Sequence, residues 1–250
     1  MTAPRPVTAE DMPAWLSRIA VVDTETTGTD VENDRIVQGA WVELGPKGPV
    51  NTYTCLINPG VEIPQGAIDV HGITNERARA EGVAPAGAVL QLAENIEGFR
   101  DQGGAIVAFN AVFDLPLIDR ELRRHHGRGL ELTGVRVVDP MVLDRACDIH
   151  RNHVKGGKRR LGELARHYDA KQDGAHDALA DCMTTARVLW RILQRYRHLR
   201  EMTLDQLVAF QTQAAIAWAI NTEQYLRRGD RPDAVVDGSW PYFPPPKDAA

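Results

Sequence analysis

The order of hydrophobic and polar positions along the 250-residue chain predicts strands first and helices afterwards. Short apolar runs over residues 19–23, 35–44 and 50–58 have the length and composition of strands. Residues 45–49, between the second and third runs, are rich in glycine and proline. This composition is typical of a hairpin turn, so we expect the second and third strands to be antiparallel neighbours.

From residue 85 onward the apolar residues recur mostly with the helical spacing of three and four. The predicted elements are a helix over residues 85–100, a buried strand over 105–109, a helix over 113–125, a strand over 135–138, and helices over 140–149, 161–168 and 177–196. Three strands followed by alternating helices and strands predict an α/β fold in which helices flank a mixed sheet.

Residues 201–250 have a different pattern, and we expect them to form a helical appendage next to a main domain over residues 1–200. Thr203 precedes a helical pattern that runs toward Arg228 and whose apolar positions include Ile216 and Ile220. Prolines from residue 241 onward exclude a helix or an inner strand. The appendage is therefore expected to end in a loose, proline-rich tail.

Composition is that of an ordinary globular protein, 43% hydrophobic and 25% charged. The longest apolar run covers residues 214–220, whereas a membrane span needs about 20 residues. The first residues lack the pattern of a signal peptide, and the three cysteines are too far apart for a disulfide framework, so we expect a cytoplasmic protein. A net charge of −5 requires that any nucleic acid be bound through a local basic patch or metal ions, and residues 151–171 are the candidate patch.

Acidic residues mark the ends of two predicted strands. Asp23 and Glu25 are two apart on a strand and therefore point to the same face. Asp114 follows the buried strand over residues 105–109, and functional groups in α/β sheets gather at the carboxyl ends of strands. Alternatively, the first pair forms a turn with a solvated side chain, and Asp114 caps the following helix.

A third acidic position comes with a histidine. His176 and Asp181 are five residues apart, which on one regular helix separates their directions by about 140°. Gly174 indicates that the helix begins near His176, so Asp181 is expected in the second turn. This arrangement suits a fixed metal ligand beside a movable base, although a histidine near a helix start is commonly an ordinary surface residue.

Together these segments resemble the three exonuclease motifs of the DEDD superfamily, histidine variant, and are most similar to the epsilon proofreading branch of bacterial replicative polymerases. The motifs are Asp23-Thr-Glu-Thr-Thr-Gly28, Asn110-Ala-Val-Phe-Asp114 and His176-x4-Asp181. The resemblance covers residues 18–195 and departs from the family at Phe109, where a histidine is frequent. It implies a ribonuclease H-like, mixed five-stranded sheet flanked by helices.

The resemblance also implies hydrolysis of DNA from its 3′ end to nucleoside 5′-monophosphates, in proofreading, replication or repair. Two Mg²⁺ (or Mn²⁺) ions would be held by Asp23, Glu25, Asp114 and Asp181, and His176 would be the general base. Physical chemistry agrees with this, because four carboxylates repel a phosphodiester unless cations neutralise them. Oxygen ligands also favour Mg²⁺ or Mn²⁺ over zinc.

Contacts to the substrate are expected from residues beside these motifs, namely Thr26, Thr27, Gly28, Val70, His71, Asn110 and Phe113. For Phe113, core packing is an equal alternative. The expected partners are single-stranded or frayed DNA 3′ ends, with RNA possible, and a DNA polymerase or sliding clamp. A sliding clamp is among the expected partners because residues 206–210 resemble a clamp-binding peptide. Two other functions stay open: an exoribonuclease of the ribonuclease T or oligoribonuclease type, and a non-catalytic module that binds nucleic acid or a polymerase.

Overall fold

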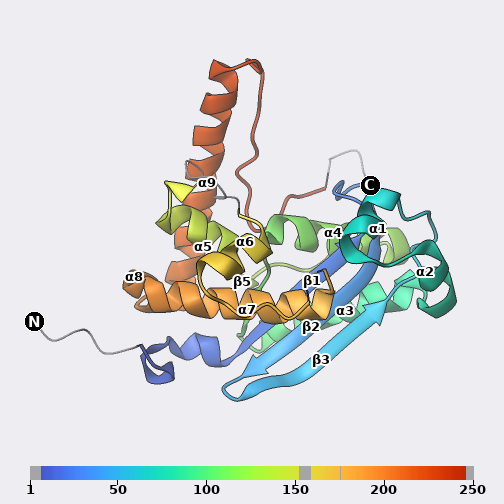
Figure 1. Ribbon diagram of the computed structural model, residues 1–250, viewed down its shortest axis with the longest axis horizontal. Helices are drawn as coiled ribbons and strands as arrows, with labels where there is room; N and C mark the ends of the chain where they lie inside the picture. Colours follow the sequence, from blue (N-terminus) through green and yellow to red (C-terminus); the bar gives the residue numbers. More distant parts are fainter. Residues whose placement is uncertain (1–6, 152–158, 175, 246–250) are drawn as a thin grey trace, which may run out of the picture.

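A mixed five-stranded sheet forms the centre of the computed structural model, which describes residues 7–151, 159–174 and 176–245 (Figure 1). The strands are β1 (Ile19–Thr26), β2 (Ile36–Gly45), β3 (Gly48–Leu56), β4 (Ala105–Val107) and β5 (Arg136–Val138). Their order is β3-β2-β1-β4-β5; β1, β4 and β5 are parallel, and β2 is antiparallel to both β1 and β3. The predicted fold class is confirmed.

The hairpin between β2 and β3 is also confirmed, and it is tighter than the sequence pattern suggested. Gly45 pairs with Gly48, so the turn consists of Pro46 and Lys47. Gly48 has a φ of 122°, which strongly favours glycine. On the other side of β2, strand β1 continues to Thr26, beyond its predicted end, because its polar residues keep pairing with β2.

Helices cover both faces of the sheet. Their bounds are α1 (Gln65–His71), α2 (Asn75–Glu81), α3 (Pro85–Asp101), α4 (Ala111–His126), α5 (Pro140–Cys147), α6 (Leu161–His167), α7 (Ala178–Arg195), α8 (Arg197–Arg200) and α9 (Leu204–Arg228), with two 3₁₀ turns at Ala9–Asp11 and Ala14–Ser17. The sequence pattern missed α1, α2 and α8, because helices of two turns or fewer are too short to show a period. None of the helices in the described part of the chain combines the length and apolar character of a membrane span.

Side chains alternate along β1 and so supply two hydrophobic cores. Ala20 and Val22 pack with residues of α3 and α4, whereas Ile19 and Val21 pack with residues of α7. Both cores consist mainly of fully buried aliphatic side chains, each worth about 1.5–3 kcal/mol of transfer free energy. The sheet is therefore a rigid support for the polar residues that continue β1.

Helix α9 begins at the predicted Thr203 cap, whose hydroxyl accepts a hydrogen bond from the Gln206 amide. Its buried face differs from the expected one. The buried residues recur every four positions and are Leu207, Gln211, Ala215 and Ala219. The apolar Ile216 and Ile220 are instead 39% and 53% exposed. Gln211 is buried because its side chain hydrogen-bonds to the backbone of Val137 and Asp139 at β5 and the start of α5.

The clamp-like segment over residues 206–210 lies entirely within α9. Leu207 is fully buried, and Phe210 packs against the core between the sheet and α7. An extended peptide conformation at this segment would require part of α9 to unfold.

The expectation of a loose tail is wrong as far as residue 245. The chain turns back along α9 after Arg228 and reaches α4 (Figure 1). Trp240 is only 8% exposed and belongs to the core between the sheet and α3 and α4. Prolines exclude regular structure here, but aromatic side chains bury large areas without it.

Candidate active site

Strand β1 brings two carboxylates to one face of the sheet. Alternation places Asp23 and Glu25 on the same face as Val21, which packs against α7. Thr24 points to the opposite face, and its hydroxyl donates a 2.7 Å hydrogen bond to Oδ1 of Asp114 on α4. Asp23 and Glu25 therefore lie on the α7 side of the sheet, while Thr24 between them contacts Asp114 of α4 on the other side. The sequence reasoning had missed Thr24, although it lies inside the first motif.

Asp114 belongs to the first turn of α4 and does not cap the helix, so the capping alternative is wrong. The N-cap is Asn110, which has a left-handed backbone with a φ of 66°. Its amide and that of Ala111 donate to the carboxylate of Asp139 at 3.1 and 2.9 Å. Asp139 thus supports the start of α4 and leaves the buried carboxylate of Asp114 available for the site.

His176 and Asp181 meet because His176 lies outside the helix. Helix α7 begins at Ala178, so Asp181 is in its first turn and not in the second turn as predicted. His176 has a left-handed backbone with a φ of 62°, and its amide donates to Oδ2 of Asp181 at 3.2 Å. Ligand atoms of Glu25, His176 and Asp181 all lie within 4.8 Å of one another. Because His176 precedes α7 and has a left-handed backbone, the separation of about 140° expected within one continuous helix does not apply.

Gln38 on β2 holds the start of α7 beside β1. It is the register partner of Glu25. Its Oε1 accepts a hydrogen bond from the Ala178 amide at 3.2 Å, and its Nε2 donates to Asp177 at 3.4 Å. Sequence reasoning had missed Gln38, because a lone glutamine in a strand carries no local signal of such a contact.

Burial and mutual repulsion disfavour ionisation of the four acidic groups. Burial, followed by repulsion from Asp181 and Asp114, raises the pKa of Glu25 from 4.5 to about 7. Burial raises the pKa of Asp114 from 3.8 to about 7, although hydrogen bonds from Thr24 oppose this shift. Burial and repulsion from Asp114, Glu25 and Asp181 raise the pKa of Asp23 well above its usual range. Burial also raises the pKa of Asp181.

A divalent cation fits this set of groups. Oδ1 of Asp181 is buried and has no hydrogen-bond partner in the described part of the chain. Buried carboxylates that repel one another are stabilised when a cation binds between them, and oxygen donors suit Mg²⁺ or Mn²⁺. The imidazole of His176 adds a nitrogen ligand to this group.

The residues after β1 form a closed loop over residues 27–35. The Thr27 hydroxyl donates to Oδ1 of Asp34 at 2.7 Å, and the Thr27 amide donates to the Arg35 carbonyl at 2.9 Å. Both donors of Thr27 are thus used inside the loop. The Thr26 hydroxyl donates to the Gly28 carbonyl. A Cβ atom at Gly28 would lie 2.4 Å from Oδ2 of Asp34, so a larger residue there would displace the Asp34 carboxylate.

The other predicted substrate residues lie in two regions. Val70 is 52% exposed at the end of α1, and the adjacent His71 is half-buried. Burial lowers the pKa of His71. Phe113 packs against the core with α3 and α4. Asn110 lines a cavity of about 380 Å³ between α5, α9 and the tail.

The proposed basic patch over residues 151–171 is only partly available. Arg151 and Arg159 are paired with the buried Asp144, at 2.6 and 2.7 Å, so they neutralise an internal charge. Lys155 and Lys158 lie outside the described residues.

The fold and this cluster of groups agree with the comparison to known proteins. A family model described as exonuclease (RNase_T) matches residues 20–189. The chain therefore belongs to the exonuclease family of the DEDD fold. It is 28% identical over 193 residues to the PolC-type DNA polymerase III of Streptococcus agalactiae, and 32% identical over 191 residues to the 3′-5′ exonuclease DinG of Bacillus subtilis. These matches cover 77% and 76% of the chain but only 12% and 19% of the relatives' own lengths.

Solved structures share the fold. The Escherichia coli exonuclease I complex with single-stranded DNA superposes with a TM-score of 0.62 at 22% identity, over 73% of this chain and 42% of that one. Exonuclease X in complex with 5′-overhanging duplex DNA has a TM-score of 0.52 at 23% identity, over 77% of this chain and 99% of that one. The ribonuclease H-like architecture expected from the motifs is thereby confirmed.

Proposed function

We propose that this chain is a metal-dependent 3′→5′ exonuclease that hydrolyses DNA from the 3′ end and releases nucleoside 5′-monophosphates. The observation that carries the proposal is the meeting of Glu25, His176 and Asp181 within 4.8 Å. Repulsion from Asp114 and Asp181 also helps to raise the pKa of both Glu25 and Asp23. Family membership supports this chemistry, and the relative DinG carries it in its name.

Asp23, Glu25, Asp114 and Asp181 would hold two Mg²⁺ or Mn²⁺ ions. When bound, these ions supply the positive charge that neutralises the carboxylates, activates water and stabilises the departing oxygen. Asp23 lies on β1 opposite Ala40 of β2, so its backbone is held in the sheet by this pairing. The hydrogen bond from the Thr24 hydroxyl orients the carboxylate of Asp114. The rigid supports keep the reacting groups in place without a rearrangement during the reaction.

His176 accepts the proton of the attacking water at a ring nitrogen. Its side chain is exposed beside the buried carboxylates of Glu25 and Asp181, so it contacts solvent water and the acidic cluster at once. A neutral imidazole is an efficient general base near pH 7. Its backbone is joined to Asp181 by one hydrogen bond, which ties the position of the base to that of a proposed metal ligand.

The terminal nucleotide lies, in this proposal, between the loop over residues 27–35 and the end of α1. Val70 offers an exposed apolar surface for the terminal base, and the half-buried His71 follows it at the end of α1. Single-stranded DNA is the proposed substrate because exonuclease I, which shares the fold, is solved with it. Association with a replicative polymerase is proposed from the PolC relatives.

Digestion of matched oligonucleotides tests the proposal. DNA and RNA of one sequence, labelled at the 5′ end, are incubated with the protein and Mg²⁺, Mn²⁺ or a chelator. We expect a ladder that shortens DNA from its 3′ end, depends on metal and disappears in Asp23→Asn. Faster digestion of RNA would make the enzyme an exoribonuclease. The absence of a metal-dependent ladder on either substrate would leave a nucleic-acid-binding module.

A further inference from the structure

The loop over residues 27–35 is fastened to α4 by ion pairs of Glu32 with Arg120 and of Arg35 with Glu121. Glu32 at its far side receives hydrogen bonds from Nε of Arg120 at 3.0 Å and from Nη2 at 2.8 Å. The Glu32 carbonyl accepts a further bond from Arg124 at 3.1 Å. A two-pronged arginine–carboxylate pair restricts both distance and direction. The loop that begins at Thr27 is therefore held against the helix that carries Asp114.

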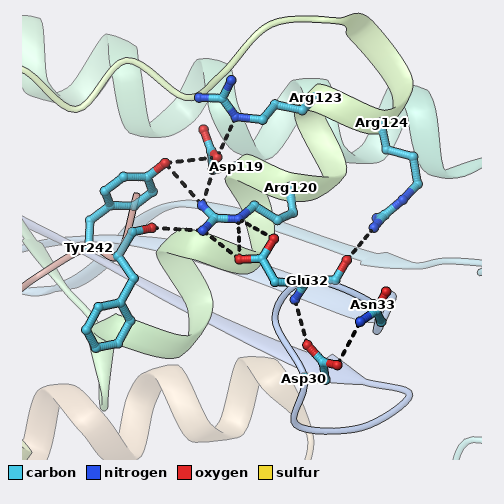
Figure 2. Close-up of polar contacts among 9 residues, drawn as sticks. Asp30, Glu32, Asn33, Asp119, Arg120, Arg123, Arg124 and Tyr242 are labelled. Atoms are coloured by element: carbon cyan, nitrogen blue, oxygen red, sulfur yellow. Dashed lines mark hydrogen bonds and ion pairs between the residues drawn. The ribbon is translucent and has the colours of Figure 1, made fainter. Parts of the chain in front are cut away.

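The tail completes the surroundings of Arg120, as Figure 2 shows for Tyr242. Nη1 of Arg120 donates to the Tyr242 hydroxyl at 3.1 Å, and Nη2 donates to the Phe243 carbonyl at 3.0 Å. The remaining hydrogen of Nη1 goes to Asp119 at 3.0 Å. A guanidinium has five N–H donors. Two go to Glu32, one to Asp119 and two to the tail, so every donor has a partner.

Burial makes these contacts strong. The side chains of Asp119 and Arg120 are almost inaccessible to solvent. The Tyr242 hydroxyl also donates to Asp119 at 3.0 Å, so it connects both members of the buried charge pair. A buried charge that loses a hydrogen-bond partner is destabilised, and Glu32 on the loop is one of the remaining partners of Arg120.

The tail is anchored at its other end on α9. The Val236 amide donates to Glu223 at 3.1 Å, and a Cβ atom at Gly238 would lie 3.2 Å from Ala219, so the tail runs close along the helix. A continuous chain of contacts thus leads from α9 through the tail to Arg120, then to Glu32 and the loop.

We propose that Tyr242 and Phe243 are positioning residues for the 3′-terminal nucleotide, acting through Arg120 and Glu32 on the loop over residues 27–35. This inference rests on the proposed function. The carboxylates of β1 are held by the sheet and not by the tail. Loss of the tail contact therefore weakens binding of the 3′ end and leaves the chemical step intact.

Steady-state kinetics and hydrogen exchange of the full chain test this. The substrate is a single-stranded DNA oligonucleotide with Mg²⁺ at 25 °C, a temperature at which melting curves show each variant folded. Tyr242→Phe removes the hydroxyl and keeps the ring. We expect KM to rise about five- to tenfold, with kcat within twofold of wild type, because a hydrogen bond to a charged group is lost. Amide exchange over residues 27–35 rises in the same variant.

Two further variants make the test specific. Glu32→Gln is expected to raise KM similarly, and the double variant is expected to raise it no more than the larger single effect, since both act through Arg120. Tyr225→Phe is the matched control, because Tyr225 is 77% exposed on α9 and its hydroxyl removal is expected to change neither KM nor exchange.

The failures are distinguishable. An inactive wild-type protein overturns the proposed function and, with it, the positioning role. An active wild type with unchanged KM in Tyr242→Phe overturns the positioning role alone, whether or not the melting temperature falls. Unchanged exchange over residues 27–35 also overturns it, because the tail would then not control the loop.

Discussion

Replacement of Glu25 by glutamine is expected to stabilise the metal-free protein above neutral pH. Burial and repulsion raise the pKa of Glu25 from 4.5 to about 7 in the folded protein. A raised pKa favours the protonated form, so the folded state loses stability as pH rises from the unfolded value through the folded one. Each pKa unit corresponds to about 1.4 kcal/mol, which makes the full penalty about 3 kcal/mol. Glutamine has nearly the same shape as glutamate and does not ionise, so it avoids this penalty.

Thermal melting in chelator, at pH 5 and at pH 8, measures this effect. For a chain of this length, 1 kcal/mol shifts the melting temperature by about 2–4 °C. Glu25→Gln should therefore melt about 6–12 °C above wild type at pH 8, and the gain should largely disappear at pH 5, where the carboxyl is already mostly protonated. Mg²⁺ should stabilise the wild type more than the variant. The electrostatic reasoning would be refuted if the melting temperature of Glu25→Gln differed from wild type equally at both pH values, or if it were lower than wild type at pH 8.

Three other predictions concern the base, the metal and the core. His176→Ala should lower kcat about 100-fold or more with little change in KM, in a steady-state assay on single-stranded DNA; near-normal kcat would exclude it as the base. Removal of divalent ions by chelator should abolish hydrolysis and lower the melting temperature at pH 8, and Mg²⁺ should restore both; activity in chelator would contradict a metal-dependent reaction. Asp144→Ala should destabilise the fold by about 3–5 kcal/mol in denaturant titration, because it leaves Arg151 and Arg159 without their buried carboxylate; a loss below 1 kcal/mol would show that the cluster relaxes.

The sheet and the long helices could be predicted because their signals are local. Runs of apolar residues and the turn at Pro46 and Lys47 give the hairpin, and helical spacing gives α3 within one residue of its end. The carboxylates of Asp23 and Glu25 could be assigned to one face from strand alternation alone. Their meeting with Asp114 depends on the order and direction of the strands, which motif resemblance supplied and periodicity did not.

The features that could not be predicted from the sequence depend on contacts between residues far apart along the chain. Arg120 binds Glu32 and Tyr242, which are 88 and 122 residues away along the chain. Nothing in the proline-rich tail marks Tyr242 as the partner of a buried charge. The left-handed backbone at His176 was likewise invisible, because that conformation is uncommon for residues other than glycine, and no nearby residue requires it.

Diffraction from crystals soaked in Mn²⁺ tests the central claim most directly, since manganese is located by its anomalous signal. We expect two manganese peaks coordinated by carboxylate oxygens of Asp23, Glu25, Asp114 and Asp181, with His176 beside them. Manganese bound elsewhere, with these four carboxylates free of metal, would contradict it.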